Sequence, residues 1–313
     1  MAGDNETLVG EFILLGLSLH PQAKVPFLSL LLIVYIVTLL GNGLIVLLIM
    51  ADHQLHTPMY FFLSNISFLD ICYSTSSLPQ ILAYSFVEKP TVSYKRCFTQ
   101  GYISLYLGMT ECLLLAVMAY DRFVAICNPL HYPLIINRKV CIQLAAASWA
   151  STLLLTLVPA LMKPKRFCRH ISNHFVCELQ ALLKLVCSDI HNNEIATWVS
   201  GQLVLVGSFL FILVTYLRIG LAVLRIRSAQ GRSKAFSTCG SHLAVVGIFY
   251  GTAMFMYLSP QSKSTADQDK MISVFYGALT PKPNLQTEEQ GCEGSLKENN
   301  IKGNVCTELI KHI

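Results

Sequence analysis

Residues 118–133 read MAYDRFVAICNPLHYP, and their first three residues end an apolar stretch that covers residues 97–120. The stretch is long enough for a helix that crosses a lipid bilayer, which needs roughly 20 apolar residues. Asp121 and Arg122 follow its last apolar turns. An arginine that is buried there without a partner is costly. The neighbouring acid can neutralise the base, so we expect a charge pair at the end of a membrane-spanning helix.

Five further apolar runs of similar length flank this stretch. They are bounded by charge, proline or polar clusters, and they cover residues 26–50, 58–82, 140–162, 197–220 and 237–258. A seventh run, MISVFYGALTP, stops at Pro281. Its roughly 12 residues cover only about 18 Å as a helix. We therefore predict an all-α membrane protein, a seven-transmembrane-helix bundle with the seventh helix truncated near Pro281.

The composition agrees with a protein whose surface faces lipid. The 313 residues are 53% hydrophobic and 13% charged, and the mean hydropathy is +0.53. Soluble domains carry about 25% charged residues, so this chain has too few to cover a soluble surface. We divide the chain into an extracellular N-terminus (1–25), a helix-bundle domain (26–281) and a polar, disordered tail (282–313).

Several function classes are disfavoured by the sequence. The net charge of +5 is spread without a long basic stripe, so no nucleic-acid partner is expected. HExxH, GxSxG and Walker-type motifs are absent, as are CxxC pairs and Cys/His clusters with zinc spacing. We therefore expect no enzyme, no catalytic residue and no metal centre. The histidines at the edges of the runs, His56, His131 and His242, are interpreted as interfacial or capping residues.

The orientation is not decided by the basic residues, because both sets of loops carry them. Asn5-Glu6-Thr7 is a glycosylation sequon in the polar N-terminus. Four cysteines fall on the same side of the membrane as this sequon: Cys97, Cys168, Cys177 and Cys187. Disulfides persist on the oxidising side, which favours an N-terminus outside the cell. From the residues alone, the four cysteines allow three pairings, and four free thiols remain the alternative.

Three sequence blocks carry a family resemblance. They are MAYDRFVAICNPLHYP, LHTPMYFFLSNISFLD at residues 55–70, and KAFSTCGSHL at residues 234–243, with FYGT at 249–252. In this order between the apolar runs, they resemble the vertebrate odorant receptors, a family of rhodopsin-like G-protein-coupled receptors. The resemblance runs from about Gly10 to Pro281. It implies a plasma-membrane receptor that binds a small hydrophobic volatile molecule and activates a stimulatory olfactory-type heterotrimeric G protein, so that cAMP rises.

The resemblance also assigns roles to charged residues. Arg122 is implied as the arginine that couples to the G protein, with Asp121, Tyr216 and Lys234 as its companions; an interfacial salt bridge is the alternative. Asp70 and Glu111 lie well inside two apolar runs, where isolated charges must pair, protonate or bind a cation. The family uses such a pair as a sodium site, whereas a protonated hydrogen-bond network is the alternative.

Disulfides and the ligand site are likewise implied by resemblance. Cys97 should bridge to Cys177, and Cys168 to Cys187, holding a lid over the mouth of the pocket. Carried over by position, the odorant pocket comprises Ser104, Leu105, Gly108, Met109, Ser200, Val204, Gly251, Thr252 and Tyr257. Ordinary packing between helices is the alternative for each, because small residues are enriched there.

The C-terminus departs from the family pattern. After Pro281 the chain reads KPNLQTEEQGCEG, without the asparagine–proline motif and the basic helix that the resemblance leads us to expect. Half a helix leaves backbone groups unpaired in hydrocarbon. We therefore weigh a signalling-defective form, retained in the endoplasmic reticulum, as the alternative function. A small transporter is less favoured, because no internal repeat is present.

Overall fold

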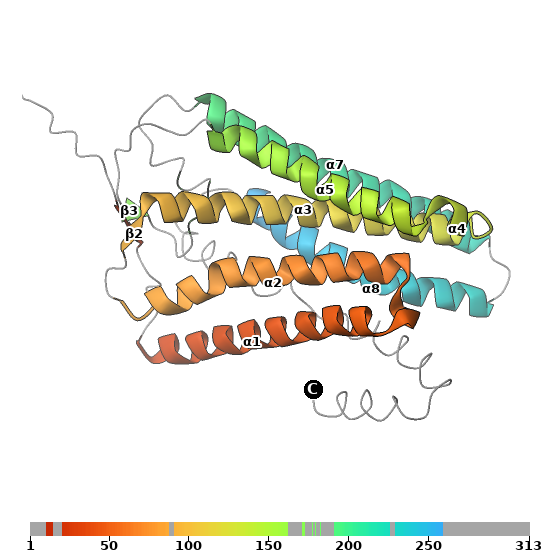
Figure 1. The fold of residues 1–313 in the computed structure, drawn as a ribbon, viewed down its shortest axis with the longest axis horizontal. Coiled ribbons are helices and arrows are strands. Elements are labelled where there is room, and N and C mark those ends of the chain that lie inside the picture. The colour runs from red at the N-terminus through yellow and green to blue at the C-terminus, as the bar shows by residue number, and fades with distance from the viewer. Residues whose placement is uncertain are drawn as a thin grey trace, which may run out of the picture.

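In the computed structural model, the described residues are 11–14, 21–87, 91–161, 171–172, 177, 179, 182, 191–225 and 229–258. Six helices of 24 to 34 residues dominate this part of the chain. They are α1 (Pro21–Ala51), α2 (Pro58–Tyr84), α3 (Tyr94–Cys127), α5 (Arg138–Leu161), α7 (His191–Leu224) and α8 (Ala229–Leu258). Successive helices run in opposite directions through one bundle (Figure 1).

These helices agree with the six runs expected from the sequence. The truncated seventh helix at 270–281 and the tail at 282–313 lie outside the described residues. Helix α3 is longer than its apolar run, since it continues through Asp121 and Arg122 to Cys127. Nothing in MAYDRFVAIC breaks a helix. Asn128 precedes Pro129, and a residue before proline is disfavoured in helical geometry, so the helix ends there.

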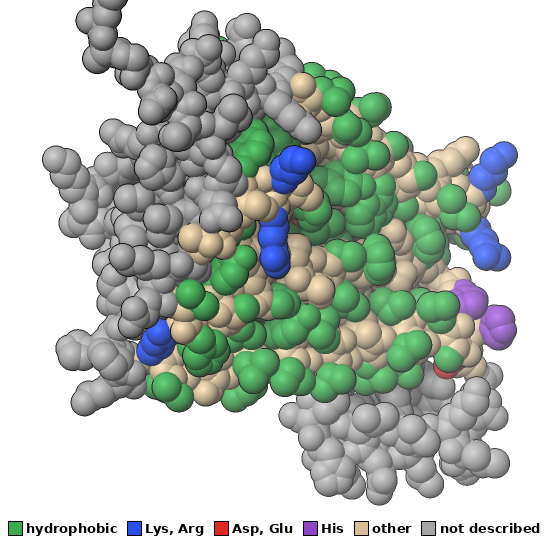
Figure 2. Space-filling model, turned by 60° about the vertical axis from the view of Figure 1, so that its left-hand side comes forward, with side chains coloured by type: hydrophobic (Ala, Val, Ile, Leu, Met, Phe, Trp, Pro, Cys, Tyr) green, Lys and Arg blue, Asp and Glu red, His purple; other side chains and the backbone are tan. Residues whose placement is uncertain are grey.

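The bundle carries a largely apolar surface. Large hydrophobic side chains are exposed along its helices, among them Leu30 and Leu40 of α1, Leu154 of α5 and Leu203 of α7. Figure 2 shows hydrophobic side chains spread over much of the coloured surface. Helices α1, α3, α5 and α7 each contain a segment long and apolar enough to cross a membrane. In α8 only Cys239–Met254 forms such an apolar stretch, and it is shorter. Exposed apolar surface on this scale suits a lipid environment.

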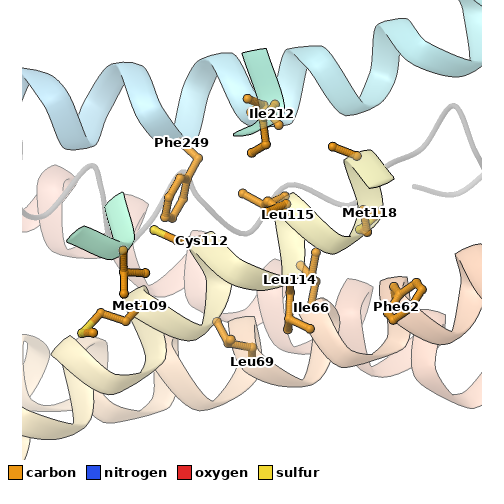
Figure 3. Close-up of a cluster of buried hydrophobic side chains, with 14 of the residues drawn as sticks. Phe62, Ile66, Leu69, Met109, Cys112, Leu114, Leu115, Met118, Ile212 and Phe249 are labelled. Carbon is orange, nitrogen blue, oxygen red and sulfur yellow. The ribbon is translucent and has the colours of Figure 1, made fainter. Parts of the chain in front are cut away.

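Helix α3 lies at the centre of the bundle. It packs against α2, α5, α7 and α8, while α1 packs against α2. The largest cluster of buried apolar residues follows α3 from Leu107 to Val124. Figure 3 shows Cys112 of α3 close to Phe249 of α8, and Leu114 of α3 beside Ile66 of α2.

A three-stranded sheet closes one end of the bundle, which we call the sheet end. It consists of β1 (Glu11–Leu14), β2 (Thr91–Ser93) and β3 (Ile171–Ser172), in the order β2-β1-β3. Strand β1 pairs antiparallel with β2, Phe12 opposite Val92, and parallel with β3. The sequence analysis did not predict this sheet. Its strands have two to four residues and come from distant parts of the chain, so no local periodicity marks them.

The opposite end of the bundle, which we call the turn end, holds two short elements (Figure 1). The 3₁₀ helix η1 (His53–Leu55) joins α1 to α2, and α4 (Tyr132–Ile135) joins α3 to α5. Asn137 caps the start of α5, because its side-chain oxygen accepts a hydrogen bond from the Val140 N–H at 3.0 Å.

Candidate functional site

The predicted ligand residues of α3 lie on one side of the helix near the sheet end. Met109 is buried, and Ser104, Leu105 and Gly108 are half-buried. Leu105 packs against both the main core cluster and a smaller cluster at the sheet end. The Ser104 hydroxyl oxygen is itself buried, and among the described residues it has no hydrogen-bond partner. A buried hydroxyl without a partner is destabilising, so it is available to a polar atom of a ligand.

The hydroxyls predicted on the facing helices already have partners. Ser200 of α7 is buried and donates to the Thr197 carbonyl oxygen at 3.1 Å. Thr252 of α8 donates to the Ile248 carbonyl oxygen at 2.7 Å. Val204 of α7 is buried in the same core cluster as Met109. Among the predicted ligand residues with a hydroxyl group and a described side chain, Ser104 therefore differs from Ser200 and Thr252, because its hydroxyl has no hydrogen-bond partner.

Two predicted ligand residues on α8 have less support. Gly251 is exposed to the surroundings of the bundle, on the side of α8 away from the buried Tyr250 and Ala253. Tyr257 belongs to α8, but its side chain lies outside the described part of the chain.

A buried hydrogen-bond network below these residues was missed by the sequence analysis. The Tyr250 hydroxyl lies 2.7 Å from the Ser208 hydroxyl, and it donates to the Cys112 carbonyl oxygen at 3.5 Å. This joins α8, α7 and α3 at one point in the core. Tyr250 belongs to the FYGT segment that carried part of the family resemblance, which was the available signal.

A disulfide fixes the chain over the sheet end. Cys97 at the start of α3 bonds to Cys177, as the resemblance implied, at a sequence separation of 80. Both are buried in a cluster with Val92 of β2, Leu179 and Leu182. The second predicted pair, Cys168 and Cys187, lies outside the described residues, as does the sequon at Asn5.

Gly101 is the position where the segment after Cys177 approaches α3 most closely. A Cβ atom on Gly101 would lie 3.1 Å from the Cys177 carbonyl oxygen and 3.2 Å from the Leu179 backbone nitrogen. Both are backbone atoms held by the disulfide, so they cannot move aside as a flexible side chain does. Glycine at this position allows the segment to lie directly on the helix.

We expect the Gly101→Ala variant to lose about 1 kcal/mol of unfolding free energy, because overpacking costs about 1–3 kcal/mol and alanine recovers part of this through helix propensity. The measurement is the thermal unfolding of the detergent-purified receptor. Gly247→Ala in α8 is the matched control, since nothing lies within 4 Å of its Cβ position. Equal melting temperatures for the two variants would show that the close approach at Gly101 is unimportant.

The two buried carboxylates of the predicted cation site lie together in the structure. Asp70 of α2 and Glu111 of α3 are 5% and 4% exposed, and they interact electrostatically. Carboxylate oxygens are hard ligands that suit hard cations rather than zinc. The donor set therefore fits a small cation. Among the described residues no group of three or more His, Cys, Asp and Glu side chains is found that could hold a metal ion.

At the turn end, Asp121 of the predicted coupling site connects α3 to α4. Its carboxylate lies 3.9 Å from Nε of Arg122 and accepts a hydrogen bond from the Tyr132 hydroxyl of α4 at 2.7 Å. Burial and this hydrogen bond hold the pKa of Tyr132 well above its usual range, so the phenol stays a donor at physiological pH. Sequence reasoning found Asp121 and Arg122 but did not assign a role to Tyr132.

The predicted companion Tyr216 has an unexpected partner. Its hydroxyl lies 2.5 Å from Nδ1 of His242, and this pair joins α7 to α8. His242 is 7% exposed, so its interpretation as an interfacial or capping residue is wrong. The charge of Arg122 acts on both Tyr216 and His242. The side chain of Lys234 lies outside the described part of α8.

A family model and the sequence relatives agree on one family, and a solved structure shares the fold. A family model described as "Olfactory receptor" matches residues 31–276. Human olfactory receptor 13H1 is 54% identical over 90% of this chain and 92% of its own length. Human olfactory receptor 13C2 is 46% identical over 100% of this chain and 98% of its own. Squid rhodopsin has a similar fold, with a TM-score of 0.69 at 16% identity, over 90% of this chain and 81% of the rhodopsin chain.

Proposed function

The chain belongs to the olfactory receptor family, and we propose that it binds a small hydrophobic odorant and activates a stimulatory olfactory-type G protein that raises cAMP. Membership makes the protein a multi-pass receptor of the plasma membrane, in a family that is generally not enzymatic. It also implies an odorant ligand and a G-protein partner. That the ligand is a small hydrophobic molecule and that the G protein is of the stimulatory olfactory type are our proposals.

The proposed orientation places the sheet end outside the cell and the turn end in the cytoplasm. The Cys97–Cys177 disulfide at the sheet end supports it, because disulfides persist on the oxidising side of a membrane. The predicted glycosylation at Asn5 belongs to the same side. The odorant then enters beneath the segment that Cys177 anchors, and the G protein meets Arg122 at the other end.

The observation that carries the ligand proposal is the unpartnered hydroxyl of Ser104. The same stretch of α3 carries Met109, which is buried in the main apolar cluster, and Leu105, which packs against that cluster. A pocket that combines apolar walls with a few placed polar groups suits a small, weakly polar ligand. We propose that Ser104 binds the hydroxyl or carbonyl oxygen of the odorant, with the apolar residues taking up its hydrocarbon part.

We expect the Ser104→Ala variant to raise the half-maximal concentration of alcohol or carbonyl odorants about tenfold, because one hydrogen bond of roughly 1.4 kcal/mol is lost. Responses to hydrocarbon odorants of similar size should change by less than about twofold. The measurement is a dose–response curve in cells with a cAMP reporter.

Ser151→Ala is the matched control for this test, since Ser151 is exposed on α5 and its hydroxyl bonds to the Ser148 carbonyl oxygen. If Ser104→Ala shifts neither odorant class, while the parent chain responds to both, Ser104 does not bind the ligand. If the parent chain responds to no odorant in a broad panel, the result contradicts the proposed odorant-receptor function itself.

We propose that the turn end works as a two-state switch. In the resting state Asp121 binds Arg122 and is held in place by Tyr132. In the active state Arg122 leaves Asp121 for the backbone carbonyls of the G protein. A switch requires an element whose two arrangements differ by only a few kcal/mol. The long contact of 3.9 Å between Asp121 and Arg122 supports the proposal, because a weak ion pair is easily exchanged for another partner.

We also propose that Asp70 and Glu111 hold a sodium ion in the resting receptor. Their proximity and burial support a cation, since two ionised carboxylates repel each other there. A bound sodium ion neutralises part of this charge between α2 and α3. A shared proton is the competing arrangement, and sodium dependence of the basal cAMP level distinguishes the two.

The alternative of a signalling-defective receptor is less well supported. It depends on residues 270–313, which lie outside the described residues. The matches to olfactory receptors over 90% and 100% of this chain do not favour it. Epitope tags on both termini test the point directly. Seven crossings leave the N-terminal tag exposed on intact cells and the C-terminal tag hidden.

A further inference from the structure

Two exposed histidines face each other in the turn between α1 and α2. Nδ1 of His53 lies 3.3 Å from Nδ1 of His56, and both side chains are exposed. The ring centroids are 4.9 Å apart, and the rings are nearly perpendicular. The two nitrogens are therefore closer than the rings that carry them. Histidine side chains are visible in purple at the surface of the turn end in Figure 2.

The local backbone holds this pair in place. His53 begins the 3₁₀ helix η1 and His56 is its C-cap, with the His56 N–H bonded to the His53 carbonyl oxygen at 3.2 Å. In a 3₁₀ helix residues three apart lie on the same face, so both imidazoles project to one side. Asp52 caps the start, because its Oδ1 accepts from the Gln54 N–H at 2.9 Å. The turn is thus fixed by hydrogen bonds that involve neither ring.

The separation of the two nitrogens matches a tetrahedral metal ion. Zinc–nitrogen bonds of about 2.0–2.1 Å at the tetrahedral angle place two ligand nitrogens about 3.3–3.4 Å apart. Neighbouring positions of a square-planar ion with bonds of about 2.0 Å place them only about 2.8–2.9 Å apart, as copper(II) prefers. The observed 3.3 Å agrees with the tetrahedral ion.

We propose that His53 and His56 form a Zn²⁺-binding site on the turn end. The chain supplies two imidazole nitrogens, and water or an external ligand completes the coordination, since no group of three His, Cys, Asp and Glu side chains occurs among the described residues. This makes the site open and exchangeable rather than structural. In the proposed orientation it faces the cytoplasm, next to the start of α2. Zinc binding then clamps the α1–α2 turn.

A hydrogen bond between the two rings is the competing explanation of the same distance. One neutral ring can donate from Nδ1 to the other. Asparagine separates the two explanations, because it preserves hydrogen bonding but is a poor zinc ligand. Cysteine has the opposite property, since its thiolate binds zinc strongly.

The test is a zinc titration of the full chain in nanodiscs, against a fluorescent zinc chelator of known affinity. We expect His53→Asn and His56→Asn to bind this Zn²⁺ at least about tenfold more weakly than the parent chain, because even changes to groups around ligands cost about 10–100-fold. His53→Cys should retain zinc. His131→Ala, which removes another exposed histidine of the turn end, should leave the affinity unchanged.

A second measurement identifies the ligands. Co²⁺ in place of zinc should give the intense visible absorption of a tetrahedral site in the parent chain, and this should disappear in both asparagine variants. Equal zinc affinity and equal cobalt spectra in the parent chain and the asparagine variants would overturn the proposal. Neither readout requires an odorant or a G protein, so failure of the receptor function would not be confused with failure of the zinc site.

Discussion

Replacing Cys97 with serine is expected to lower the free energy of unfolding by about 2–4.5 kcal/mol and to remove most receptor from the cell surface. The disulfide closes a loop of 80 residues. In the chain-entropy description such a loop accounts for about 4.5 kcal/mol, and membrane insertion already restricts the unfolded chain, which lowers this figure. Thermal unfolding in detergent and antibody staining of intact cells measure the two effects.

The matched control is Cys72→Ser, because Cys72 is a half-buried free cysteine of α2. It should keep its surface level and melting temperature close to those of the parent chain. The double variant Cys97→Ser/Cys177→Ser should be no worse than either single variant, since the one bond is already lost. Normal surface staining of the single variants, with an unchanged melting temperature, would show that the sheet end is held by packing alone.

The second large effect concerns Arg122. We expect Arg122→Ala to reduce the maximal cAMP response at least about tenfold, because the proposed contact with the G protein is lost. The variant should still reach the surface, since Asp121 keeps its hydrogen bond from Tyr132. The measurement is the cAMP response to a known agonist of the parent chain, normalised to surface staining.

Arg138→Ala provides the control for this prediction, as Arg138 is an exposed arginine at the start of α5. It removes the same charge from the same end of the bundle. A full cAMP response from Arg122→Ala would reject the coupling role of Arg122. Asp121→Asn should have the opposite effect on basal activity, because weakening the ion pair releases Arg122 in the absence of an odorant.

The long helices could be predicted because their signal is local. Each apolar run is a property of about 20 neighbouring residues, and lipid forces the backbone of such a run to satisfy its own hydrogen bonds. The end of α3 was less predictable. The expected span stopped at residue 120, whereas the helix continues to Cys127. Charged residues mark the end of an apolar run, but only Pro129 marks the end of the helix.

The candidate sites were predictable in part. Resemblance placed Cys97 with Cys177, and the structure contains this bond. Resemblance also made Tyr216 a companion of Arg122, and the structure shows an electrostatic influence of Arg122 on Tyr216. The resemblance could not show that the Ser104 hydroxyl lacks a hydrogen-bond partner while the Ser200 hydroxyl has one. Whether a serine hydroxyl finds a partner depends on the position of the carbonyl oxygens around it in the folded helix. His242 was misjudged for a related reason. Its burial depends on how α8 packs against α7, and its own sequence neighbourhood does not determine this packing.

The sequence by itself determined the apolar runs, the charge pair Asp121–Arg122 and the positions of the cysteines. These follow from composition and spacing over short distances. Only the tertiary structure decided the sheet of β1, β2 and β3, the close approach at Gly101 and the link between Tyr250 and Ser208. Each of these joins segments that are 40 or more residues apart. Such contacts form only when helices that are distant in sequence pack together. A short stretch of sequence therefore contains no pattern that predicts them.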